Sequence, residues 1–113
     1  MTCPLYVIGA GGHGKVVIST LQECGFSVDG VLDDDRTKVG GSLLGVPVIG
    51  TIDSFIARNE RAKAIFAVGN NHTRKMLSER LSSVPVEWIS AVHPRAWVHS
   101  SVRLREGTVV FAG

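Results

Sequence analysis

Apolar residues occur in short runs along the chain, and most of these runs stop at a glycine or an acidic residue. Leu5–Ile8 ends at a glycine, Val28–Leu32 at an aspartate, and Ala64–Val68 at another glycine. Short, largely apolar runs of this kind are typical of strands buried on both faces of a parallel sheet. The pattern also predicts strands at Val46–Ile49 and Val84–Ile89.

Between these runs the apolar positions follow the spacing of helices. His13–Cys24 carries its apolar residues at helical spacing, and Gly25 follows where a glycine commonly ends a helix. A short second helix is predicted to run through Arg58, with Thr51 or Asp53 as its cap.

A third helix is predicted to start at Asn70 or Asn71 and to reach about Leu81. Strands and helices therefore alternate at short intervals, and parallel strands need crossover connections, which run right-handed. The sequence predicts an α/β fold, with a parallel sheet and helices flanking both of its faces. We assign this domain to residues 1–90.

After Ser90 the spacing changes to six residues. A track of large apolar residues and a track of smaller residues share this period: Val92, Val98, Leu104 and Val110 in the first, Ala96, Val102 and Thr108 in the second. Two interleaved tracks fit the hexapeptide repeat of a parallel β-helix, whereas a helix or a single strand would not keep both. Residues 91–113 are expected to be the first turns of such a β-helix, and the small number of hexads indicates a truncated piece of a longer protein.

Composition narrows the classes of function. The chain has 113 residues, of which 44% are hydrophobic and 19% charged, so it is expected to fold as a globular domain with its own core. A net charge of +2, with scattered lysines and arginines, does not form the basic surface of a nucleic-acid-binding protein. No segment approaches the roughly 20 apolar residues that span a bilayer, so no membrane partner is expected.

Cysteines and histidines lack the spacing of metal ligands. Cys3 and Cys24 are expected to be reduced thiols, which favours a cytoplasmic protein. His72, His93 and His99 show no paired spacing, so no metal site is predicted. No Ser-His-Asp or Cys-His arrangement can be argued from these spacings, and no catalytic residue is assigned.

Residues Gly9–Gly14 match the pattern G-x-G-x-x-G, directly after one predicted strand and at the start of a helix. Glycines there allow a sharp turn and let a phosphate approach the N–H groups at the helix N-terminus, where the helix dipole is positive. His13 could donate a hydrogen bond to a phosphate or sugar oxygen, or simply lie at the surface. The plainer interpretation of the whole loop is a glycine-rich turn without a ligand.

Acidic and amide side chains follow two of the predicted strands. Asp33 and Asp34 come about 20 residues after the glycine loop, where an acid commonly binds ribose hydroxyls and would suit NAD. A solvated turn is the alternative. Gly69 and Asn70 follow another predicted strand and are therefore expected at the same crevice, where the glycine leaves room for a ligand and the amide offers donors and acceptors. An Asn there could equally be a helix cap.

Four segments, taken together and in order, resemble one known family. They are the glycine loop through Lys15, the strand end Val31–Asp34, the run Ala67–Asn71 with Arg74 after it, and the pair His93–Pro94 before the hexads. This set resembles bacterial sugar acyltransferases of the NeuD and PglD type, which include sialic acid O-acetyltransferases and UDP-4-amino-sugar N-acetyltransferases.

The resemblance implies a Rossmann-like N-terminal domain that binds a nucleotide sugar, usually UDP-linked. It also implies a left-handed β-helix that forms a homotrimer and binds acetyl-CoA between neighbouring subunits. Gly11, Gly12 and His13 would lie against the nucleotide sugar, Asp33 and Asp34 would contact the uridine, and Gly69 with Asn70 would line the same cleft.

In that family the general base is a histidine further along the β-helix, beyond the residues of this chain. The resemblance therefore implies an acetyltransferase as the full-length protein, and a chain that is inactive alone. Two other functions stay open from the residues: a non-catalytic nucleotide-binding module, and the NAD-binding domain of an oxidoreductase.

Overall fold

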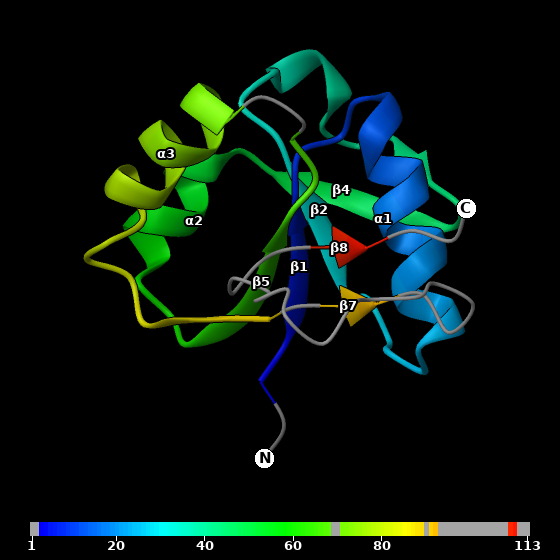
Figure 1. Cartoon of the computed structure of the whole chain (residues 1–113). Coiled ribbons are helices and arrows are strands. Elements are labelled where there is room, and N and C mark those ends of the chain that lie inside the picture. The colour runs from blue at the N-terminus through cyan, green and yellow to red at the C-terminus, as the bar shows by residue number, and fades with distance from the viewer. Residues whose placement is uncertain (1–2, 69–70, 90, 93–108, 111–113) are drawn as a thin grey trace, which may run out of the picture.

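The computed structural model describes residues 3–68, 71–89, 91–92 and 109–110, and Figure 1 shows their arrangement. In chain order the elements are β1 (Leu5–Ile8), α1 (Gly12–Glu23), β2 (Gly30–Leu32), a 3-10 turn (Arg36–Lys38), β3 (Ser42–Leu43), β4 (Val46–Gly50), α2 (Ile52–Arg58), β5 (Ala62–Phe66), α3 (Asn71–Arg80), β6 (Val86–Trp88), β7 (Ala91–Val92) and β8 (Val109–Val110).

Six of these strands form one sheet in the order β3-β4-β2-β1-β5-β6. All neighbouring pairs are parallel except β3 and β4, which are antiparallel. β1 lies between β2 and β5, with Val7 opposite both Val31 and Ile65. Because the chain runs first to one side of β1 and then to the other, the carboxyl ends of β1 and β5 flank a topological switch point, where α/β sheets bind ligands.

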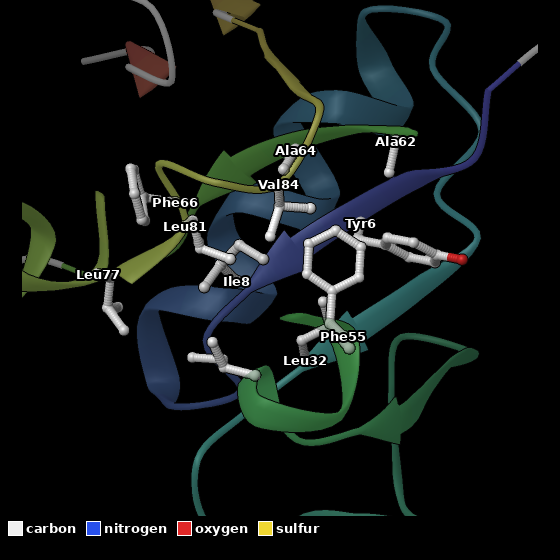
Figure 2. Packing of buried hydrophobic residues seen from close by; sticks show 11 residues of the cluster. Tyr6, Ile8, Leu32, Phe55, Ala62, Ala64, Phe66, Leu77, Leu81 and Val84 are labelled. Atoms are coloured by element: carbon white, nitrogen blue, oxygen red, sulfur yellow. The ribbon is translucent and has the colours of Figure 1, made fainter. Parts of the chain in front are cut away.

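Successive side chains of β1 point to opposite faces of the sheet, and each face is covered by helices. Val7 belongs to the cluster under α1, which includes Ile18 and Leu21. Tyr6 and Ile8 belong to the cluster on the other face, where α2 and α3 pack (Figures 1 and 2). The prediction of an α/β sheet with helices on both faces is confirmed.

The predicted helix ends are confirmed in their hydrogen bonds. Gly25 has a φ of +86°, and its N–H donates to Gln22 O while that of Phe26 donates to Leu21 O, the two bonds of a Schellman motif. At α2, the Oγ1 of Thr51 accepts from the N–H of Ser54 at 3.1 Å. Thr51, and not Asp53, is therefore the cap.

Strand bounds differ from the prediction by a few residues. β5 starts at Ala62, two residues earlier than the apolar run, because Lys63 pairs with Leu5 at the start of β1. A polar side chain interrupts the apolar pattern there without interrupting the ladder. β2 and β6 are shorter than predicted, each having three residues.

A short hairpin at the sheet edge was not predicted. Leu43 pairs with Val46 in the antiparallel register, so the turn consists of Leu44 and Gly45. Both have positive φ, +48° and +80°, as a type I′ turn requires. The expectation of an entirely parallel sheet is therefore corrected: β3 is an antiparallel strand at the edge.

A second, two-stranded sheet joins β7 and β8 in parallel, with Ala91 opposite Val109 and Val92 opposite Val110. The hexads predicted at positions 93–108 lie outside the described residues. Within the part of the chain that is described, no helix combines the length and the apolar character needed to cross a bilayer.

Candidate functional site

The glycine loop crosses the carboxyl ends of the central strands. Gly9 has a φ of +118°, which L side chains rarely adopt, and its N–H donates to Leu32 O at 2.7 Å. A Cβ on Gly9 would also lie 3.1 Å from the carbonyl oxygen of Ala67, which follows β5. Glycine at this position therefore lets β1, β2 and β5 meet at one point.

The last glycine of the loop serves close packing. A Cβ on Gly14 would lie 2.9 Å from the carbonyl oxygen of Gly9 and 3.0 Å from Cδ1 of Leu43. The N–H of Gly14 donates to Gly11 O at 2.8 Å, which closes the loop. A side chain at either outer glycine of the pattern, Gly9 or Gly14, would therefore crowd neighbouring backbone atoms.

The predicted phosphate-binding residues Gly11, Gly12 and His13 lie together at the N-terminus of α1. Gly11 is the exposed N-cap, with extended backbone and no side chain to cap the first turn, and nothing lies within 4 Å of the position a Cβ would take. Gly12 starts the helix and His13 is exposed. The helix terminus has no acidic residue in its first turn, so it presents a positive dipole end to an open surface.

Asp33 connects β2 to the glycine loop. Its Oδ2 accepts a hydrogen bond from the N–H of Ala10 at 2.6 Å, and its Oδ1 accepts one from the N–H of Asp35 at 2.8 Å. The side chain is half-buried and holds the loop in place. An ionised carboxylate has about four acceptor positions, so Asp33 retains capacity for a ligand donor.

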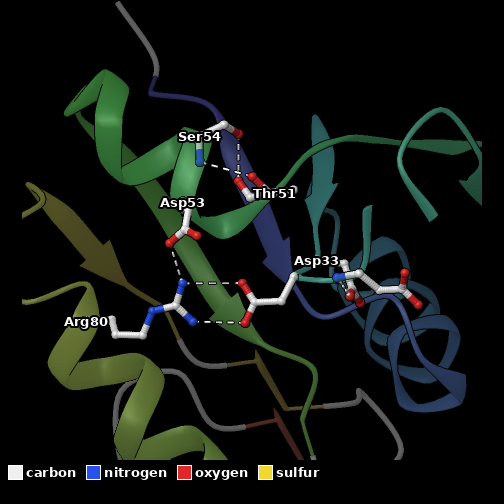
Figure 3. Close-up of polar contacts among 7 residues, drawn as sticks. Asp33, Thr51, Asp53, Ser54 and Arg80 are labelled. Carbon is white, nitrogen blue, oxygen red and sulfur yellow. Dashed lines mark hydrogen bonds and ion pairs between the residues drawn. The ribbon is translucent and has the colours of Figure 1, made fainter. Parts of the chain in front are cut away.

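Asp34 is bound by an arginine that the sequence did not single out (Figure 3). Nη1 of Arg80, the last residue of α3, lies 2.9 Å from Oδ2 of Asp34, and Nη2 lies 3.3 Å from Oδ1. Nη2 also donates to Oδ1 of Asp53, at 2.7 Å. The hydrogen bonding that Arg80 donates to Asp34 is the main reason why the pKa of Arg80 is raised above its ordinary value.

Asp35 is exposed and shapes the backbone after β2. Its Oδ1 accepts from the hydroxyl of Thr37 at 2.6 Å and from the N–H of the same residue at 3.0 Å. These two hydrogen bonds lower the pKa of the Asp35 carboxyl. The residue caps the 3-10 turn Arg36–Lys38.

A cavity of about 200 Å³ opens beside the glycine loop. Its lining combines two carboxylates with apolar side chains and one hydroxyl: Gly9, Asp33, Asp34, Ile52, Val68, Thr73 and Leu77. A second cavity of about 270 Å³ adjoins the loop at Ala10, lined also by Thr37, Lys38, Gly41, Ser42, Leu43 and Val48. The structure therefore brings the glycine loop, Asp33 and Asp34 together at one site.

Two predicted site residues, Gly69 and Asn70, lie outside the described residues. Their chain neighbours are described: Val68 lines the first cavity, and Asn71 starts α3. No group of three metal-ligating side chains occurs among the residues with described positions.

Comparison with known proteins identifies the family. The model of the PglD N-terminal domain matches residues 4–81. UDP-N-acetylbacillosamine N-acetyltransferase of Bacillus subtilis is 34% identical over 108 residues, which cover 94% of this chain and 50% of that protein.

Solved structures with the same fold come from related enzymes. PerB of Caulobacter crescentus, solved in complex with CoA and GDP-perosamine, superposes with a TM-score of 0.83 at 35% identity, covering 100% of this chain and 53% of that one. The acetyltransferase domain of PglB from Neisseria gonorrhoeae, solved with acetyl coenzyme A, gives 0.80 at 37% identity, covering 99% and 54%.

This chain spans about half the length of these relatives. The family match covers the glycine loop, the β2 end with its aspartates, and all of α3. The resemblance stated from the sequence is thereby confirmed: the chain belongs to the family of PglD N-terminal domains.

Proposed function

We propose that this chain binds a nucleotide sugar, as the N-terminal part of an acetyl-CoA-dependent sugar acetyltransferase. One observation carries the proposal: the glycine loop that leads into the N-terminus of α1 lines a cavity at Gly9, and two carboxylates belong to the same lining. A helix terminus attracts phosphate, and carboxylates accept hydrogen bonds from bases and hydroxyls. The names of the relatives include a UDP-linked and a GDP-linked sugar, so the partner is taken to be a sugar nucleotide.

In this proposal the diphosphate lies against the N–H groups around Gly11, Gly12 and His13. Asp33 and Asp34 accept hydrogen bonds from the nucleoside, which occupies the cavity of about 200 Å³. Gly69 and Asn70, which lie between β5 and α3 in the sequence, are assigned to the same cleft on the strength of the family resemblance alone. The apolar wall, which includes Ile52 and Leu77, suits the face of a base.

The part after residue 90 is proposed to start a left-handed parallel β-helix. The register of β7 and β8 pairs positions 91 and 109, and 109 − 91 = 18 residues corresponds to three hexads. Three hexads would form one complete coil of such a β-helix, so position 109 would lie beside position 91 on the next coil. The full-length protein is then expected to form a homotrimer.

Acetyl-CoA is the proposed co-substrate, and it supplies the thioester that a sugar amine or hydroxyl attacks. Its site and the histidine that accepts the proton are assigned to the β-helix outside this chain, as the resemblance implies. The residues of this chain would bind and orient the acceptor sugar through its nucleotide. Neither Cys3 nor Cys24 is in a disulfide, which supports a reducing compartment such as the cytoplasm.

Calorimetric titration of the purified chain tests the binding function. UDP-sugars and GDP-sugars are titrated beside NAD, the ligand of the alternative oxidoreductase function. We expect saturable binding of at least one sugar nucleotide and weaker binding of NAD. Tighter binding of NAD than of every sugar nucleotide would contradict the proposal.

A further inference from the structure

Arg80 joins three elements at the rim of the candidate site. Its guanidinium lies between Asp34, after β2, and Asp53, in the first turn of α2 (Figure 3). The pair with Asp34 is a fork, with one Nη on each carboxylate oxygen, at 2.9 and 3.3 Å. A guanidinium fork fixes the plane of a carboxylate, whereas an ammonium group would act as a point charge.

Only one member of this trio lines the cavity of about 200 Å³. Asp34 is part of its lining, while Arg80 and Asp53 are not. Arg80 therefore does not line the cavity itself, and its link to a ligand there is the contact it makes with Asp34. Asp53 provides a natural control, because it accepts from Nη2 of the same guanidinium at 2.7 Å and does not line the cavity.

The chemistry of a fixed carboxylate restricts what it recognises. An ionised carboxylate only accepts hydrogen bonds, and the Arg80 fork uses one acceptor position on each oxygen. The remaining positions accept an N–H from the ligand. Uracil and guanine carry a proton on the ring nitrogen of their pairing edge, whereas cytosine and adenine present an unprotonated nitrogen there, which would repel the carboxylate.

We propose that Arg80 is a positioning residue that holds Asp34 as a fixed acceptor, and that Asp34 selects nucleotides whose base has a ring N–H. The inference rests on the proposed function, since it concerns the nucleotide bound in that site. The UDP and GDP in the names of the relatives both carry bases of the selected kind. The side chain of Asp34 is 53% exposed, so a ligand can reach it from solvent, and apolar side chains such as Ile52 and Leu77 share the cavity lining with it.

The test is a titration of the full chain with UDP, GDP, CDP and ADP. For the unmodified protein we expect UDP or GDP to bind about tenfold or more tightly than CDP and ADP, the discrimination typical of one hydrogen bond to a charged group. Asp34→Asn should reduce this ratio to about threefold or less, because the amide can also donate to an unprotonated ring nitrogen.

Arg80→Gln should lower the same ratio by about fivefold, as loss of a partly exposed ion pair allows. In the Asp34→Asn background it should change the ratio no further, because its effect passes through Asp34. Asp53→Asn, the matched control, should leave the ratio unchanged. Thermal melts of each variant measure stability separately from base preference.

Two results would overturn the inference in distinguishable ways. If Arg80→Gln weakened binding of all four nucleotides equally, Arg80 would support the fold only, and the proposed function would stand. If the unmodified chain bound none of the four nucleotides, the proposed function would fall and this inference with it.

Discussion

At the scale of single residues, two adjacent aspartates of the same chemistry have different partners. Asp33 holds the glycine loop through the N–H of Ala10, while Asp34 binds Arg80, 46 positions further along the chain. The sequence predicted that both lie near the glycine loop, because they end the strand that follows it. It could not predict Arg80, since nothing local in the sequence distinguishes that cation from the other lysines and arginines. A partner so distant in sequence is defined only by the packing of α3.

Gly11 allows a test of the phosphate site that does not depend on the fold. Its φ of −76° suits any residue, and a Cβ there meets nothing within 4 Å. Gly11→Asp should keep or slightly raise the melting temperature, because Asp is a favourable N-cap. The added negative charge should weaken binding of a nucleoside diphosphate by about tenfold or more. Calorimetry measures the affinity.

Gly11→Asn is the matched control, because it caps the helix equally well without adding charge. We expect it to bind at least several times more tightly than Gly11→Asp. Equal affinities of the two variants would mean that the diphosphate does not approach the N-terminus of α1.

At the scale of elements, helix ends that depend on the local residue type were predictable from the sequence. Strand ends that depend on pairing with a neighbouring strand were not. Thr51 and Gly25 were identified from residue type, and their hydrogen bonds are present. The start of β5 was misplaced because Lys63 interrupts an apolar run while still pairing with Leu5. The β3–β4 hairpin escaped prediction because Leu44 is an unusual residue for a type I′ turn.

That turn offers a stabilising substitution. Leu44 has a φ of +48° and an exposed fraction of 53%, so it bears backbone strain and makes little buried contact. Leu44→Asn, which produces the favoured Asn-Gly turn, should raise the free energy of unfolding by about 0.5 to 1 kcal/mol. Urea denaturation measures it. Leu44→Ala keeps the strain and should give little change, so an equal gain in both variants would refute the explanation.

The cap of α2 should contribute measurably to stability. Thr51→Ala removes the acceptor for the N–H of Ser54 and should cost about 1 kcal/mol in the free energy of unfolding. Thr51→Ser keeps the hydroxyl and should restore most of the loss. If denaturation curves of the Ala and Ser variants coincided, the hydrogen bond at 3.1 Å would contribute no stability.

At the scale of the whole molecule, the place of the site followed from the order of elements. A parallel sheet with β1 between β2 and β5 places the glycine loop and the aspartates after β2 at the carboxyl ends of neighbouring strands, and the cavity lies there. The alternation of strands and helices along the sequence was enough to predict that the site lies at the carboxyl ends of the strands. The edge strand β3 and the salt bridges of Arg80 depend on contacts between distant segments, which a single sequence does not reveal.

The residues that line the site follow β1 and β2 or belong to α2 and α3, so a ligand bound there should stabilise the entire domain. Lining residues come from separate segments of the chain, such as Gly9, Asp34 and Leu77, and unfolding disperses them. A ligand that binds only the folded state adds about 2.7 kcal/mol at a concentration one hundred times its dissociation constant. For a domain of this size the melting temperature should rise by roughly 10 to 20 °C.

The phosphates should account for much of that rise, because the positive end of α1 is part of the site. Thermal melts with a nucleoside diphosphate and with the matching nucleoside at equal concentration separate the two contributions. The diphosphate should raise the melting temperature more, and Gly11→Asp should bring the two curves together. A nucleoside as stabilising as its diphosphate would show that the cavity at Asp33 and Asp34 binds the base while the glycine loop serves only to turn the chain.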